Sequence, residues 1–172
     1  MNSFLELSRM IFGAIAATDI LFYHPAVTTE GDAYGGTIGT TTVGTTKNAL
    51  WDDVSGAQAY AGTDEYRKIF LKLHSNVGAD VLSNPVVWVA STTPGGDEIL
   101  IKAATAAADS SNVQSDITGE SFITPTAKTA GVALDNIASD TTTVAYWLKR
   151  NVPASTSGYA DDAATIRIEG EV

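Results

Sequence analysis

Two pairs of adjacent carboxylates are the first residues whose types could do chemistry. They are Asp52-Asp53 and Asp161-Asp162, and glycoside hydrolysis uses a pair of carboxyl groups. Adjacent side chains on a strand or turn point apart, however, and both pairs fall where turns are predicted. We therefore interpret both pairs as solvated turn residues, with weak cation binding as the alternative.

The two histidines have no nucleophile paired with them in the sequence. His24 stands beside Pro25 at a predicted strand end, and His74 falls in a predicted turn. The chain has no cysteine, so a zinc site would need carboxylates that the fold brings together. Neither a nucleophile elbow nor a phosphate-binding loop motif occurs. We predict no catalytic residue, no cofactor and no metal, and a protein that is not an enzyme.

The segment from Asp109 to Glu120 has the length of a calcium-binding EF-hand loop. Such a loop needs oxygen ligands at its third and fifth positions and glycine at its sixth. Here those positions hold Ser111, Val113 and Gln114. Val113 has no side-chain oxygen and Gln114 disfavours the sharp turn, so we predict a polar surface loop.

Composition limits both the size of the fold and its partners. The chain has 172 residues, of which 44% are hydrophobic and 17% charged, which favours one domain with a real core. Its net charge of −10 repels phosphate backbones and anionic lipid, so we expect neither nucleic-acid nor membrane binding. The acidity serves solubility alone or contact with a basic partner.

The first 17 residues favour a short amphipathic helix that would act as an N-terminal arm. Ser3 and Glu6 have the spacing of a capping box. Apolar residues follow at helical spacing, at Phe4, Leu7, Ile11 and Ile15. So short a helix needs a surface to pack on, and that surface is either its own domain or a neighbouring subunit.

Residues 18–172 are predicted to form one all-β domain. Strand-forming runs alternate with turn signals, which favours two antiparallel sheets face to face, with jelly-roll or immunoglobulin-like topology left open. The predicted strands cover residues 18–24, 66–73, 86–89, 98–102, 121–125, 131–134, 141–150 and 164–170. The Gly/Thr-rich stretch 26–48 is an extended arm, a loosely paired edge strand or a long loop.

Alternation within the strongest strands predicts their two faces. In residues 66–73, Ile69, Leu71 and Leu73 share one face, while Tyr66 and Phe70 share the other with two lysines. We expect that second face to be solvated or to contact another subunit. Residues 57–62, just before this strand, form either a helical turn or an Ω-like loop.

Three tryptophans could form a platform for a sugar, since an aromatic ring offers a flat apolar face. They are Trp51, Trp88 and Trp147. Each lies in a predicted strand or at its entry, so packing in the core or at a subunit interface is the competing interpretation.

Several blocks in order resemble small virion structural proteins of tailed bacteriophages. These proteins typically begin with a DI.FY strand, matched by Asp19 to Tyr23. They carry an LFDDV.G.EA..G..EYR block, matched by Leu50 to Arg67 with Trp51 in the Phe position. A VWIRR.VPAG..A strand and turn is matched by Tyr146 to Ala160, and a final L.VEG by Ile166 to Gly170. The resemblance departs at Leu73, where the family has Asn, and it does not cover residues 1–17.

The resemblance implies a virion location and a capsid decoration or cement role. The partners would be the major capsid protein and copies of the chain itself, as a symmetric oligomer such as a trimer. A tail or baseplate protein that binds a host-surface carbohydrate or receptor is the alternative. We expect Arg67 and Arg150 to make ion pairs that fix the strands. The residues expected at contacts with the shell or another subunit are Phe4, Leu7, Ile11, Ile15, Tyr34, Trp51, Tyr66 and Phe70.

Overall fold

The fold is taken from a computed structural model of the chain. It describes residues 3–10, 15–28, 33–46, 48–77, 80–93, 95–104, 117, 119–138, 140–157 and 162–172. For residues 3–10 the description covers the backbone alone. Most of the segment 109–120 that was compared with a calcium loop lies outside the described residues.

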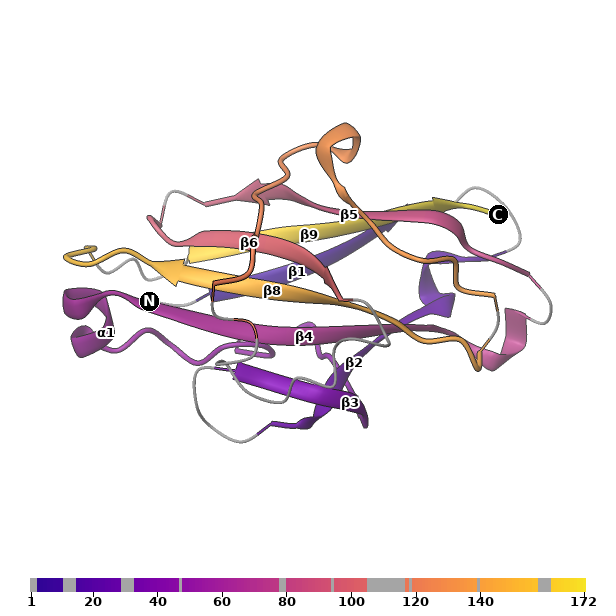
Figure 1. Ribbon diagram of the computed structural model, residues 1–172, viewed down its shortest axis with the longest axis horizontal. Coiled ribbons are helices and arrows are strands. Elements are labelled where there is room, and N and C mark those ends of the chain that lie inside the picture. The colour runs from indigo at the N-terminus through magenta and orange to yellow at the C-terminus, as the bar shows by residue number, and fades with distance from the viewer. Residues whose placement is uncertain are drawn as a thin grey trace.

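The described chain is an all-β sandwich, as the sequence predicted. Its strands are β1 (Ser3–Met10), β2 (Ile20–Val27), β3 (Ala33–Thr42), β4 (Thr63–Leu73), β5 (Ser83–Thr92), β6 (Glu98–Ala104), β7 (Val132–Ala133), β8 (Val144–Val152) and β9 (Asp162–Glu171). One sheet has the order β1-β9-β5-β7 and the other the order β2-β3-β4-β8-β6, with an additional β2–β4 pairing. Figure 1 shows the strands running along the long axis of the molecule.

The main core lies between the two sheets and follows the predicted alternation. β4 contributes Ile69, Leu71 and Leu73, and β8 contributes Val144, Tyr146 and Leu148. Two isoleucines of β9, Ile166 and Ile168, face them from the other sheet. The sequence pattern therefore identified the inward face of β4 correctly, because alternation with period two is what a half-buried strand requires.

The predicted N-terminal helix is wrong, because residues 3–10 form strand β1. This strand runs parallel to β9, from Ser3 opposite Asp162 to Met10 opposite Glu169. This pairing supplies hydrogen-bond partners for the backbone N–H and C=O groups along the outer edge of β9. Tertiary pairing of this kind outweighs the helical spacing of the apolar residues in the local sequence. Phe4 and Leu7 thus belong to a strand of the sandwich, and Ile11 lies outside the described residues.

The predicted boundary at residue 17 is also wrong, since the chain on both sides of it belongs to one sandwich. Ile15 is 0% exposed and is part of the main core. A short 3₁₀ turn, Ala17–Asp19, then leads into β2. Ile15 is therefore a core residue in this chain and not a contact to the shell.

The second face of β4 is covered by the chain itself, so its predicted exposure is wrong. Tyr66 and Phe70 are 4% and 7% exposed and join Trp147 of β8 in a second hydrophobic cluster. Partly buried side chains from β2, β3 and the segment after residue 117 pack on this cluster, namely Tyr23, Ile38 and Phe122. The rings of Tyr66 and Phe122 are 5.6 Å apart. Tyr66 and Phe70 therefore serve a second core.

Two open questions about loops are answered by the fold. The stretch 26–48 contains β3, which pairs with β2 through two register shifts and with β4 over residues 33–34. It is therefore a strand between two others, and its interpretation as an edge strand is wrong. Residues 56–61 form a short helix, α1 (Gly56–Ala61). The segment 121–125 makes one isolated bridge, Ile101 with Ile123, instead of a full strand.

The burial of Ile15 leads to a direct prediction. Ile15→Ala should lower the free energy of unfolding by about 2–5 kcal/mol, because it leaves a cavity between the sheets. Ile123, which is 49% exposed, is the matched control, and Ile123→Ala should cost less than about 1 kcal/mol. Urea unfolding of the two variants measures both values. Equal stability of the Ile15 variant and the parent would place Ile15 outside the core.

Candidate interaction surface

A fully buried arginine organises one end of the sandwich. Arg150 is 1% exposed and lies opposite Glu65 in the antiparallel β4–β8 pairing. Its Nε donates to Glu65 Oε2 at 2.8 Å, and its Nη2 contacts the same oxygen. Both Nη atoms also lie 3.1 Å from the backbone carbonyl oxygen of Asp52. The guanidinium thus joins two strands to the Leu50–Asp53 loop.

A second buried arginine holds the same loop two residues earlier. Arg67 is 4% exposed, and its Nε donates to the carbonyl oxygen of Leu50 at 2.8 Å. Its Nη1 donates to the carbonyl oxygen of Tyr66 at 2.9 Å. Between the two anchored carbonyls, Trp51 is 3% exposed, and its ring lies 5.4 Å from Arg150 Cζ. Hydrogen bonds to charged donors are the stronger ones, so this loop is firmly fixed.

The network continues from Glu65 into helix α1 through one glutamine. Gln58 Nε2 donates to Glu65 Oε1 at 3.1 Å. The same side chain closes a capping box, in which Gln58 Oε1 accepts from the backbone N–H of Ser55 and Ser55 Oγ accepts from that of Gln58. Gln58 therefore links the start of the helix to the buried ion pair.

The other end of α1 is joined to the turn that follows β8. The carbonyl oxygens of Tyr60 and Ala59 accept hydrogen bonds from Ser155 and Thr156 at 3.2 and 3.1 Å. Gly62 ends the helix at φ +79°, and a Cβ there would lie 3.0 Å from the backbone nitrogen of Ala154. Glycine is therefore required at this position both for its backbone angle and for the close approach.

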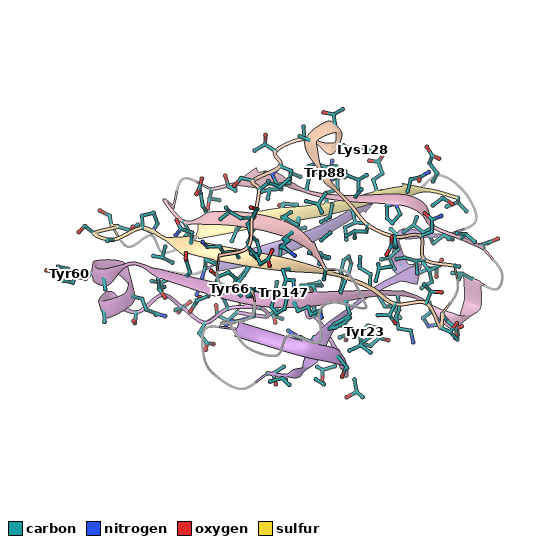
Figure 2. All side chains as sticks on the ribbon, viewed as in Figure 1. Tyr23, Tyr60, Tyr66, Trp88, Lys128 and Trp147 are labelled. Carbon is teal, nitrogen blue, oxygen red and sulfur yellow. The ribbon has the colours of Figure 1, made fainter. Side chains whose placement is uncertain are left out.

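We call the exposed residues of 56–61 and 153–157 the α1 rim. None of the residues in these two segments is charged, although the whole chain carries −10. α1 buries none of its own residues, and Tyr60 is 80% exposed. Figure 2 shows Tyr60 projecting from one end of the long axis, away from the body of the protein. A rigidly held, uncharged surface with an exposed tyrosine is suited to protein contact.

The predicted contact residues are not brought together at an exposed surface. Trp51, Tyr66 and Phe70 are buried, and Tyr34 lies on β3 with its side chain outside the described set. Trp88 and Trp147 are 6% and 0% exposed, so the three tryptophans form no sugar platform. The prediction for Arg150 is confirmed by its ion pair with Glu65, and Arg67 fixes the strands through backbone carbonyls.

Sequence reasoning missed Glu65, Gln58 and Tyr60. Glu65 and Arg150 are 85 positions apart, so only the strand register brings them together. The same register sets Asp64 against Asn151, with Asn151 Nδ2 donating to Asp64 Oδ1 at 2.7 Å. Ser55 and Gln58 do have capping-box spacing, and that signal could have settled residues 57–62 as a helix.

The described residues also bear on metal binding and on membrane crossing. Within the described ranges, no group of three or more His, Asp or Glu side chains is placed to hold a metal ion. The exposed pair Asp52-Asp53 belongs to the anchored loop, where the Asp52 carbonyl, not its carboxylate, accepts from Arg150. No helix in the described part is long and apolar enough to cross a membrane.

The fold and this surface define an all-β sandwich protein with a structurally reinforced end. Protein-family models give no match to the sequence, and a search of curated proteins gives none either.

The buried ion pair leads to a second prediction. Arg150→Met should lower the free energy of unfolding by about 3–5 kcal/mol, because it leaves the Glu65 carboxylate buried without its counter-charge. The double variant Arg150→Met with Glu65→Leu should recover a large part of that loss, since it removes both charges.

An exposed ion pair provides the control for the test of the Arg150–Glu65 pair. Lys128→Met breaks an ion pair with Glu169 whose lysine side chain is 46% exposed, and it should cost only about 0–1 kcal/mol. Denaturant unfolding compares the parent, the two single variants Arg150→Met and Glu65→Leu, their double variant and Lys128→Met. Strictly additive costs of the two single changes would show that Glu65 and Arg150 do not act as a pair.

Proposed function

We propose that the chain is a structural component of a bacteriophage particle, namely a capsid decoration or cement protein that binds the outside of the shell and reinforces it. One observation carries the proposal. Two of the sequence blocks that resemble phage virion proteins, Leu50–Arg67 and the described part of 146–160, meet at the same end of the sandwich. There they build the α1 rim and the buried network beneath it.

The physical form of this end supports attachment as its role. Residues of the two blocks make the backbone anchors, the helix cap and the buried ion pair, and together they hold one fixed, uncharged surface. A preorganised surface loses little conformational entropy on binding. On a lattice of identical sites, modest single contacts of this kind add up through avidity.

In this proposal the partners are the major capsid protein and further copies of the chain, as a symmetric oligomer such as a trimer. The lack of charge on the rim allows an acidic chain to approach a neighbour without strong repulsion at the point of contact. The tail-associated alternative loses its original support, because the three tryptophans that motivated it are buried.

Binding to particles that lack the protein tests the proposal. The parent chain should co-sediment with such particles, and Tyr60→Ser should reduce the bound fraction at limiting concentration by at least about tenfold, as expected for a central interface tyrosine. Ile123→Ser is the matched control, since Ile123 is another exposed large apolar residue of the described chain and lies outside the α1 rim. That control should bind like the parent.

The results of this binding experiment test the proposed function and the proposed attachment surface separately. Failure of the parent chain to bind any component of the particle contradicts the proposed function. Full binding by the Tyr60 variant, with its fold intact by circular dichroism, keeps the function and shows that the α1 rim is not the attachment surface.

A further inference from the structure

A groove lies between β2 and β3, and β3 in turn adjoins β4 in the five-stranded sheet. Its volume is about 520 Å³, within the range of about 300–1,000 Å³ typical of small-molecule sites. The residues that matter for its chemistry are His24, Pro25, Thr28, Ile38, Thr40 and Thr41. It is open to solvent.

The groove results from a mismatch in the pairing of the two strands. Tyr23 lies opposite Thr42, but Pro25, two residues on, lies opposite Ile38, four residues back. β3 therefore carries two surplus residues here, which form a bulge facing His24. Bulges of this kind redirect side chains and are common next to binding sites.

Gly39 allows this bulge to close onto β2. A Cβ at Gly39 would lie 2.8 Å from the carbonyl oxygen of Pro25 and 2.9 Å from that of His24. Those contacts are with backbone atoms that cannot move aside, so only glycine fits. The Gly/Thr-rich composition of residues 33–46 thus has a structural reason in the wall of the groove.

The lining is uncharged and combines hydroxyl groups with apolar surface. Three threonines supply hydroxyls that both donate and accept, while Pro25 and Ile38 supply apolar contact. Burial, and to a lesser extent the positive charge of Arg67, lowers the pKa of His24 from its usual value. This shift favours the neutral imidazole, which offers one donor and one acceptor.

We propose that the groove between β2 and β3 binds a neutral sugar unit, such as a hexose or an N-acetylhexosamine. A sugar presents hydroxyls around an apolar ring face, which matches this lining. A charged ligand would meet no counter-charge among the lining residues, and the net charge of −10 further opposes an anion. This site is independent of the proposed attachment to a phage shell, and it uses none of the buried tryptophans.

Two-dimensional amide NMR of the full chain, titrated with glucose and with N-acetylglucosamine, tests the site. We expect fast-exchange shifts confined to residues 24–28 and 38–41, with a dissociation constant in the millimolar range. Thr40→Val, which keeps the shape but removes one lining hydroxyl, should weaken binding about two- to tenfold. Thr37→Val is the matched control, because Thr37 is exposed on the same strand but does not line the groove. It should leave binding unchanged.

Further arms of the titration can overturn the proposal. An absence of shifts with both sugars, shifts centred elsewhere, or equal weakening by Thr37→Val would each contradict it. Stronger binding of an anionic sugar such as sialic acid would contradict the neutral ligand class. The sugar unit could belong to a glycan chain or be a free monosaccharide, and a titration with a soluble glucan separates these two sources. Equal amide shifts with the glucan and with glucose indicate a glycan chain. Shifts with glucose alone indicate a free sugar.

Discussion

The buried guanidinium of Arg150 is the constraint on which one end of this protein depends. A charge that is 1% exposed is tolerated only if a counter-charge and further acceptors surround it. Glu65 supplies the counter-charge, and the backbone carbonyl of Asp52 supplies the further acceptor. The register between β4 and β8 and the path of the Leu50–Asp53 loop are therefore fixed by the same side chain. Gln58 extends the same requirement to α1, and the helix is held although it buries nothing itself.

The two faces of the five-stranded sheet are both used for packing, and this determines where contacts to other molecules can form. Inward residues of β4 and β8 meet the second sheet, and outward residues such as Tyr66 and Trp147 are covered by a second cluster. Figure 2 shows Tyr66 and Trp147 side by side in the body of the protein, while Tyr60 is at its tip. Interaction surfaces are therefore expected at ends and edges, where the α1 rim and the β2–β3 groove are found.

Local alternation predicted strands where β4, β8 and β9 form, and it predicted the inward face of β4, because period two directly reflects a half-buried strand. The prediction of a helix in the N-terminal segment was wrong for a different reason. Its apolar residues fit a helix, and only the free edge of β9, more than a hundred residues later, makes it a strand. The candidate site depended likewise on distant pairing, since Glu65 and Arg150 meet only through strand register. The exposure of Tyr60 also could not be derived from its local sequence.

The proposed place of this sandwich on the shell of a phage particle can be tested by the protein composition of purified particles. Quantitative mass spectrometry of density-banded particles should find the chain in a fixed ratio to the major capsid protein, as expected for a unit that repeats over the shell. Its absence from banded particles, with abundant chain in the soluble lysate, would contradict the account. A ratio of only a few copies per particle would contradict the decoration role and favour a place in the tail.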